Sequence, residues 1–311
     1  MQDKFNGRLI IENDMWGQDP SFGFLTPTVL TGEIPSNKRV VYGAVRDNSG
    51  QAVIRRVEVS SELDVSIQQE ICFDRRNSNV FDTNGTILGH VVRVGEVIRL
   101  YYIGFRRSKR VKFEAFSGLA ESENSGRTFT FKRMILDKRA FIFLNGSIPD
   151  IVACHWNDLD LDGNGKALVA IGNGWIERGT NTFPKYSSYF INVENFQFKS
   201  LICQIPQKND IYRLGRPRFL EGQEMRRAVL TGGKISGDYR PYFFDFNGHE
   251  FVESSNLEFP VKPERNSLFE QQVSYPEFIK FKHPNAGIFL FNGDNMGIAG
   301  CYCLNSSGLL Q

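Results

Sequence analysis

Long apolar runs and a large excess of charge of either sign are both missing from this sequence. No run approaches the roughly 20 apolar residues that a membrane-spanning helix needs, and residues 1–5 lack the apolar core of a signal peptide. Lysine and arginine number 37 against 35 acidic residues, which leaves a formal net charge of +2. Such a balance gives no long-range attraction to nucleic acid or to a membrane surface. We therefore expect a soluble, cytoplasmic protein with no nucleic-acid partner and no membrane span.

Cysteine and histidine are scarce, with five and four copies. Cys301 and Cys303 alternate along an expected strand, so both side chains point to one face, which is a poor geometry for a disulfide. No set of cysteines and histidines has the spacing of a zinc site. The stretch 158–165 has the alternating acids and glycines of a calcium loop, but Lys166 and Val169 stand where ligands would be needed. We prefer a solvated hairpin loop to a calcium site there, and we expect no metal and no cofactor.

Short apolar runs separated by turns fill the chain instead. Residues 81–131 contain four such runs, separated by two glycine-containing turns and a basic loop. Runs of this length joined by turns are typical of the strands of one antiparallel sheet. A four-stranded sheet cannot bury its own faces, so it needs neighbours of its own kind, and this is the physical basis of a propeller blade.

This pattern recurs at nearly equal intervals. Five units open at Thr26, Thr86, Ile151, Arg216 and Tyr275, which are 60, 65, 65 and 59 residues apart. No long amphipathic helix period and no linker interrupts them. We therefore expect an all-β fold, a five-bladed β-propeller that forms a single domain over residues 1–311, with an all-β sandwich as the alternative. The expected blades lie near residues 26–80, 81–133, 140–200, 211–255 and 270–305, closed by a strand over 8–12.

Several motifs along the chain are typical, in their order, of a known group of proteins. They are Val45–Gly50, Phe81–Gly85, Tyr101–Phe105, Gly118–Ser122, Gly126–Phe129, Arg216–Pro217, Tyr275–Pro276 and Phe291–Gly297. In these motifs the chain resembles the five-bladed β-propeller proteins related to glycoside hydrolase families 43 and 32. More narrowly, it is similar to a subgroup found among surface-polysaccharide biosynthesis proteins. The resemblance covers nearly the whole chain. It implies a central funnel that binds or acts on a carbohydrate or nucleotide sugar during lipopolysaccharide or capsule assembly, with glycan-assembly enzymes as candidate partners.

One catalytic group of the hydrolases is missing. In the hydrolase families an Asp stands immediately before the Pro that opens blade one, and here that position holds Thr26, before Pro27. Thr cannot act as a carboxylate base, and the opening of blade two, Gly85–Ile87, also lacks an acid. Hydrolysis of a glycosidic bond needs two carboxyl groups. Two classes of function therefore stay open: a glycosidase or glycosyl-transferring enzyme, and a catalytically silent sugar-binding or scaffold protein.

Polar and aromatic side chains are expected to meet at the mouth of the funnel. For an enzyme, the candidate acids are Asp150 and Glu270, and the candidate bases are His90 and His155. The candidate substrate-binding residues are Thr26, Arg216, Tyr275, Asn292, Asn295 and Trp156. Each class has a structural alternative, such as a hydrogen-bonded core histidine, an ion pair near the axis, a turn residue or a packed core aromatic.

Arginine and tryptophan add candidates for ligand contact. Arg216 could pair bidentately with a carboxylate or a phosphate. Trp16 and Trp175 join Trp156 as candidates for stacking on a sugar ring. The basic cluster Arg106–Arg110 could touch phosphate, although a solvated loop is the preferred interpretation.

Overall fold

The computed structural model describes residues 8–16, 22–46, 51–75, 83–107, 113–144, 146–157, 160–179, 181–220, 227–259, 261, 270–282, 287–294 and 301–305. Strands dominate this part of the chain, together with two short 3-10 helices, η1 (Asn13–Trp16) and η2 (Lys138–Leu144). Within these ranges, no helix has the length and apolar character that crossing a membrane requires.

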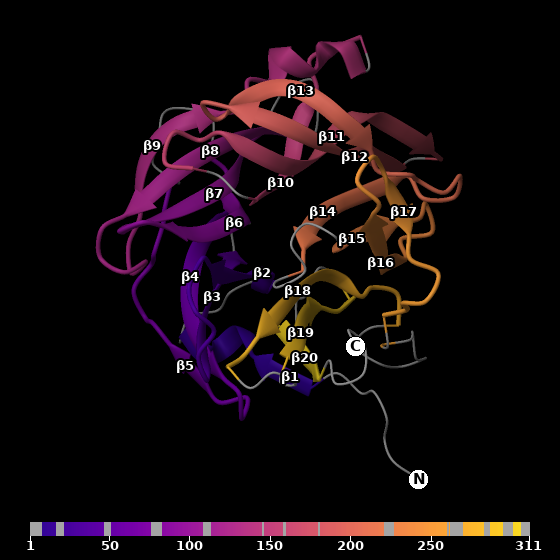
Figure 1. Cartoon of the computed structure of the whole chain (residues 1–311). Coiled ribbons are helices and arrows are strands. Elements are labelled where there is room, and N and C mark those ends of the chain that lie inside the picture. The colour runs from indigo at the N-terminus through magenta and orange to yellow at the C-terminus, as the bar shows by residue number, and fades with distance from the viewer. Residues whose placement is uncertain are drawn as a thin grey trace.

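The described strands form five antiparallel units of four strands each (Figure 1), and short parallel pairings of β2 with β6 and of β12 with β14 join four of these units into two eight-stranded sheets. The first unit contains β2 (Phe22–Thr31), β3 (Lys38–Arg46), β4 (Ala52–Ser60) and β5 (Val65–Ile67). The second contains β6 (Thr86–Val94), β7 (Val97–Arg106), β8 (Glu114–Ser122) and β9 (Thr130–Ile135). The third contains β10 (Asp150–Asn157), β11 (Gly165–Arg178), β12 (Asn181–Glu194) and β13 (Gln197–Gln204). The fourth contains β14 (Arg213–Phe219), β15 (Arg227–Gly233), β16 (Tyr239–Phe246) and β17 (Phe251–Glu253). The fifth contains β18 (Ser274–Lys280), β19 (Gly287–Asn292), β20 (Cys301–Asn305) and β1 (Arg8–Ile11).

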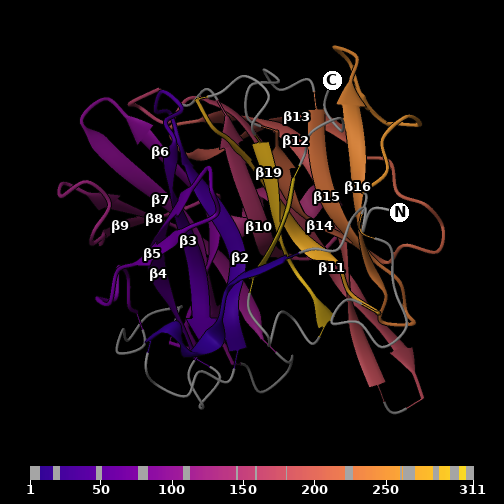
Figure 2. The same cartoon turned by 90° about the horizontal axis from the view of Figure 1, so that it is seen from below.

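These units are arranged as blades around a common centre. Figure 1 shows β2, β6, β10, β14 and β18 as the innermost strands. Figure 2, turned by 90°, shows inner strands such as β2 and β14 running through the depth of the molecule. The all-β propeller class that the strand pattern predicted is therefore confirmed, and the five units fit the expected number of blades.

The fifth blade combines strands from both ends of the described chain. β1 pairs antiparallel with β20, with Arg8 opposite Cys303 and Leu9 opposite Tyr302. Ile10 and Ile11 of β1 are buried in the apolar cluster between the fifth and first blades. β1 therefore covers an edge of hydrogen-bonding groups that β20 would otherwise present to solvent.

Large apolar side chains fill the spaces between neighbouring blades. Successive residues of a strand point to opposite faces, so each blade offers an apolar face to both neighbours. Phe243 of the fourth blade packs on Phe289 of the fifth, with ring centres 6.0 Å apart. Phe190 of the third blade packs on Phe219 and Phe251 of the fourth, at 5.8 and 5.5 Å. The 27 phenylalanines of the sequence are thus suited to wide interfaces between twisted sheets.

Candidate functional site

Each of the five innermost strands has an irregular register against its neighbour. The shifts lie between Leu25 and Thr28, Leu88 and His90, Ile151 and Ala153, Gly215 and Arg218, and Ser274 and Glu277. A bulge of this kind bends the strand and re-aims the side chains beside it. Bulges therefore redirect side chains of the inner strands in every blade.

Three of these bulges hold a residue with a positive φ angle directly before a proline. Thr26, Arg216 and Tyr275 have φ angles of 51°, 52° and 55°. Residues other than glycine rarely adopt such angles, and a residue before proline is normally held in the extended region. A disfavoured backbone that the surrounding structure maintains is characteristic of functional sites. These three residues also line the same cavity.

That cavity has a volume of about 470 Å³ and lies where the bulges meet. Every blade contributes an inner-strand residue to its lining: Thr26, Ile87, Val152, Arg216 and Tyr275. The volume is in the range of small-molecule binding sites. None of these five residues carries a carboxyl group, so they supply neither the acid nor the base of a glycosidase.

Arginine is the only charged residue type among the described residues that line the cavity. The five arginines are Arg46, Arg106, Arg107, Arg213 and Arg216. Arg106 is paired with Glu114, whose Oε2 lies 2.6 Å from its Nη2. Charges of one sign in a cleft with low-dielectric walls raise the local potential and attract ligands of the opposite sign. The described lining is therefore cationic, although the whole chain is nearly neutral.

Arg216 forms no hydrogen bond or ion pair with any residue that the structure describes. Its Nη1 is buried without a partner, and its guanidinium carbon lies 5.5 Å from the ring centre of Tyr275. Burial lowers the pKa of Arg216, an effect that the neighbouring Tyr275 and Tyr186 oppose. Because an arginine side chain stays protonated in proteins, a positive charge with unused donors stands at the cavity wall.

Tyrosine hydroxyls accompany this charge. Tyr186 and Tyr239 line the cavity together with Tyr275. Burial raises the pKa of Tyr186 to about 12 and also raises the pKa of Tyr239. Both hydroxyls therefore stay protonated at neutral pH and can donate hydrogen bonds. Arg213 lies beside them, with its guanidinium carbon 4.5 Å from the ring centre of Tyr239 and its Nη2 donating to the Lys234 carbonyl at 2.6 Å.

Aromatic rings form another part of the wall. Trp175 and Phe113 line the cavity with their ring centres 5.8 Å apart and their planes at 66°. Trp175 stands on the long β11–β12 hairpin, beyond a register shift that follows Gly172. Trp156, in contrast, is 1% exposed and stacks on Tyr101 at 4.8 Å. Of these two tryptophans, Trp175 is the one that a sugar ring in the cavity can reach.

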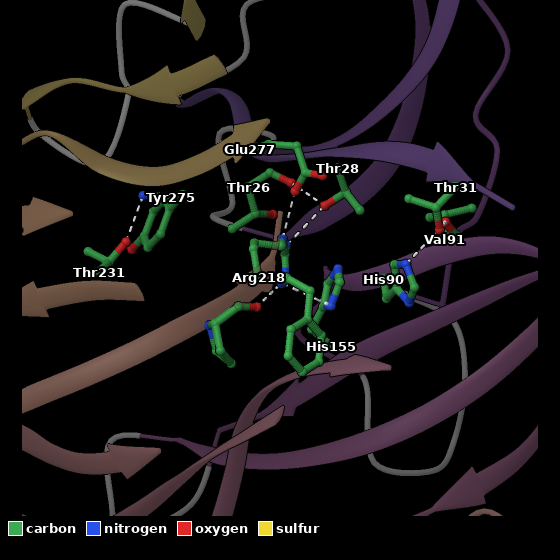
Figure 3. A network of polar contacts seen from close by, with 12 residues as sticks. Thr26, Thr28, Thr31, His90, Val91, His155, Arg218, Thr231, Tyr275 and Glu277 are labelled. Atoms are coloured by element: carbon green, nitrogen blue, oxygen red, sulfur yellow. Dashed lines mark hydrogen bonds and ion pairs between the residues drawn. The ribbon is translucent and has the colours of Figure 1, made fainter. Parts of the chain in front are cut away.

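His90 and His155 lie next to each other, outside the described cavity lining (Figure 3). Their ring centres are 4.0 Å apart and each residue is 4% exposed. His90 Nε2 lies 2.8 Å from the Thr31 hydroxyl, and His155 Nδ1 accepts from the Phe219 N–H at 3.4 Å. Burial, with a smaller effect of Arg218, lowers the pKa of His90 to about 3, and burial lowers the pKa of His155 well below its ordinary value. Both rings are neutral at pH 7, and their catalytic role stays a prediction.

Neither candidate acid lines the large cavity. The Asp150 carboxylate accepts hydrogen bonds from Lys138 Nζ at 2.9 Å and from the Ala115 N–H at 3.0 Å. It lines a smaller cavity of about 230 Å³ that shares Trp175 with the large one. Glu270 is exposed and is outside the described lining of both cavities. The structure therefore does not bring these two carboxyl groups together at the mouth of the funnel.

Asn292 ties the fifth blade to the first. Its side chain is fully buried, its Oδ1 accepts from the Thr26 N–H at 3.0 Å, and its Nδ2 donates to the Phe24 carbonyl at 2.9 Å. These bonds hold the backbone that leads into the Thr26 bulge. Asn292 thus supports the cavity from behind, whereas Asn295 lies outside the described residues.

The acidic loop that resembles a calcium loop is closed by its own side chains. The Asp160 carboxylate accepts from the backbone N–H and from Nδ2 of Asn164, at 2.8 and 3.0 Å. Asp158 lies outside the described residues. Within the described ranges, no group of three or more His, Cys, Asp or Glu residues is placed to hold a metal ion.

A buried polar network joins three inner strands (Figure 3). Arg218 Nε donates to Glu277 Oε2 at 2.8 Å, and its Nη2 donates to the Thr28 hydroxyl at 3.1 Å. Its Nη1 donates to the Pro217 carbonyl at 3.1 Å. The side chains of the ion pair are 4% and 5% exposed. Because it links β14, β18 and β2, the network holds the fourth, fifth and first blades together.

A repeated sequence motif supplies residues to both the cavity and the network. Three blades open with the pattern X-Pro-Y, at Thr26–Thr28, Arg216–Arg218 and Tyr275–Glu277. The first residue of each motif lines the cavity, and the third belongs to the network around Arg218. Sequence reasoning used the first residues and missed the third. It also missed other lining residues, among them Arg46, Arg213, Tyr186 and Tyr239.

This chain is similar to known proteins in structure, whereas the comparisons of its sequence found no match. No protein-family model matches the chain, and no curated protein matches it. Its structure is similar to that of a thermostable family-43 glycoside hydrolase, with a TM-score of 0.60 and 11% identity over 91% of this chain and 88% of that one. It is similar to Bacillus subtilis levansucrase in complex with oligosaccharides, with a TM-score of 0.60 and 12% identity over 99% and 89%. It is also similar to a sucrose-6-phosphate hydrolase from Lactobacillus gasseri, with a TM-score of 0.55 and 10% identity over 95% and 62%. At these identities the likeness establishes the fold.

Proposed function

We propose that this protein binds a carbohydrate in the cavity at the mouth of the propeller funnel and does not hydrolyse glycosides there. One observation carries the proposal: a cavity of about 470 Å³ receives a residue from every inner strand, and none of those residues is an acid. The sequence motifs favour a role in surface-glycan assembly, in the cytoplasm, with a sugar or nucleotide sugar as ligand and glycan-assembly enzymes as partners. The likeness in structure to a glycoside hydrolase and to a levansucrase in complex with oligosaccharides supports the carbohydrate part of the proposal.

The described cavity lining lacks the carboxyl groups that glycoside hydrolysis requires. Retaining and inverting glycosidases place two carboxyl groups on either side of the scissile bond, roughly 5–10 Å apart. Here Thr26 stands where the resemblance would place a catalytic Asp. The Asp150 carboxylate forms an ion pair with Lys138. Glu270 is exposed and is not among the described lining residues.

The cavity lining offers aromatic rings and hydrogen-bond donors that can bind a sugar. Trp175 and Phe113 offer apolar ring faces, and the tyrosines and arginines offer donors to hydroxyl oxygens. Among the polar atoms of the lining residues, Thr26 Oγ1, Arg213 Nε and Arg216 Nη1 are buried without a hydrogen-bond partner in the described structure. Buried polar groups in native proteins are normally satisfied, so such atoms call for a partner. A polyhydroxylated ligand supplies one.

A divergent glycosidase is the second candidate, and the position of Asp150 favours it. The smaller cavity lined by Asp150 shares Trp175 and Tyr186 with the large one. A substrate spanning both cavities would bring one carboxyl group close to a glycosidic bond. A second carboxyl group would still be required.

The test is a calorimetric binding screen against nucleotide sugars and surface-glycan fragments, run beside an assay on aryl arabinosides, xylosides and fructosides. We expect binding without turnover. Trp175→Ala should weaken binding by about tenfold, which is about 1.4 kcal/mol, because the ring face is lost. Phe143→Ala is the matched control, since Phe143 is 58% exposed and is not a lining residue. Turnover of an aryl glycoside that disappears in Asp150→Asn would establish the second candidate instead.

A further inference from the structure

We propose that the ligand of this cavity is an acidic sugar, bound through a carboxylate or phosphate group that contacts Arg216. The inference rests on the proposed function and narrows its ligand class. Neither the fold nor the likeness to solved structures requires it, because it depends on the charge of this chain's own lining residues.

The charge of the described cavity lining is unbalanced. The described lining contains five arginines and no acid. Glu114 compensates Arg106, but Arg213 and Arg216 have no carboxylate partner among the described residues. A charge removed from water is costly unless it is paired. An anionic group on the ligand would provide the missing partner, and a neutral sugar would not.

Two arginines of β14 differ in their partners. Arg218, two residues beyond Arg216, makes three hydrogen bonds, to Glu277, Thr28 and Pro217. The protein therefore supplies a carboxylate to the arginine that holds the blades together. It leaves the arginine that faces the cavity without one in the described structure. This difference fits an arginine whose partner arrives with the ligand.

The geometry around Arg216 suits an anionic group of the ligand. The guanidinium group presents its donors in a planar fork that matches the two oxygens of a carboxylate or phosphate. The positive φ of 52° at Arg216 and the bulge at Pro217 fix where the side chain leaves the strand. Tyr186, Tyr239 and Tyr275 line the cavity with it and can add hydroxyl donors. Donors thus converge on one part of the cavity, and aromatic faces at Trp175 and Phe113 remain for the sugar ring.

Carboxylates and phosphates share this chemistry, and the experiment separates them. Binding of matched pairs is measured by calorimetry: glucose against glucuronate, galactose against galacturonate, and glucose against glucose 1-phosphate and UDP-glucose. Inorganic phosphate is titrated alone. The variants are Arg216→Gln, which removes the charge, and Arg216→Lys, which keeps the charge and removes the fork. Arg227→Gln is the matched control, because Arg227 is on the same blade, pairs with Asp245 at 2.6 Å and is not a lining residue.

We expect at least one acidic sugar to bind roughly 10- to 100-fold more tightly than its neutral counterpart. Arg216→Gln should remove that preference, Arg216→Lys should restore only part of it, and Arg227→Gln should keep it. The preference should also shrink as salt rises from about 0.05 to about 0.5 M. Which acidic sugar binds decides between the carboxylate and the phosphate.

Protein stability provides a second readout that does not depend on the ligand chosen. In the ligand-free protein Arg216→Gln should melt at the same temperature as the wild type or higher, because an uncompensated charge is removed. A marked fall in melting temperature would overturn the inference, since it would mean that Arg216 has a structural partner.

The outcomes separate this inference from the proposed function. If neutral and acidic sugars bind equally and Arg216→Gln changes neither, the inference is wrong and the carbohydrate site stands. If inorganic phosphate binds as tightly as glucose 1-phosphate and UDP-glucose, the sugar contributes nothing and the proposed function is wrong. If no sugar of either kind binds, both are wrong.

Discussion

Arg216 and Arg218 lie two positions apart on β14 and have opposite surroundings. Arg218 is bonded to Glu277 and Thr28 in a network that joins three blades. Arg216 faces the cavity, with a buried Nη1 that has no partner. The same residue type thus serves the fold at one position and, in our proposal, the ligand at the other. What separates the two is the bulge that the X-Pro-Y motif introduces.

His90 and His155 provide a test at the residue scale, because their pKa values are lowered by burial. In the unfolded chain a histidine takes up a proton near pH 6.5, whereas in the folded protein His90 stays neutral down to about pH 3. The unfolded state therefore binds more protons in this window, and stability falls as the pH drops through it. We expect the melting temperature to decrease steadily from pH 7 to pH 4. The fall should be steepest below about pH 6.5, where both histidines are protonated in the unfolded chain but neutral in the folded protein.

The corresponding variant is His90→Gln, which cannot take up the proton. Its melting temperature should be lower at pH 7, because the contact with Thr31 changes, but should fall less steeply with acid. His249→Gln is the control, since His249 is exposed. An identical pH slope in wild type and His90→Gln would show that His90 takes up its proton over the same pH range in the folded protein as in the unfolded chain, and would favour a role as an acid or base.

At the scale of elements, the strand pattern and the blade openings could be predicted, but most of the cavity could not. Turns and apolar runs report local pairing, so the positions of Thr26, Arg216 and Tyr275 at the openings followed from spacing. The basic residues Arg106 and Arg107 were interpreted as a solvated loop, and the structure places both on the cavity lining. Trp175 reaches the cavity because β11 and β12 extend beyond the register shift after Gly172.

The roles of individual side chains were harder to predict for a related reason. Arg213, Tyr186 and Tyr239 come from β14, β12 and β16, and the pairing of β12 with β14 and of β15 with β14 and β16 brings them to one wall. The sequence contains no local signal for a contact between residues so far apart along the chain. Conversely, His90 and Asn292 are polar residues in apolar strands, and such residues can be ligands or internal hydrogen-bond partners. In the structure the side chains of both make internal hydrogen bonds.

β1 gives the test at the element scale. A chain starting at residue 14 loses the strand that covers β20 and the buried side chains of Ile10 and Ile11. We expect it to be insoluble, because an exposed strand edge promotes pairing between molecules. A chain starting at residue 8 keeps β1 and is the control. Soluble protein from the shorter chain with an unchanged melting temperature would contradict a closing role for β1.

At the scale of the whole molecule, charge is distributed unevenly. The formal net charge of +2 hides a cavity whose described charged residues are all arginines. The fold is similar to that of a glycoside hydrolase and a levansucrase, and one fold can support different functions because function depends on the site. The inner strands of the propeller surround a cavity whose described lining residues include no carboxylate. This combination is the basis of our proposal that the cavity binds an acidic sugar.

The most direct measurement is a crystal structure of the protein with the tightest-binding acidic sugar from the calorimetric panel. The account predicts an intact ligand in the large cavity, with an oxygen of its carboxylate or phosphate within about 3.2 Å of an Arg216 nitrogen and its sugar ring against Trp175. A ligand bound outside this cavity, or a cleaved sugar lying between two carboxyl groups, would contradict it.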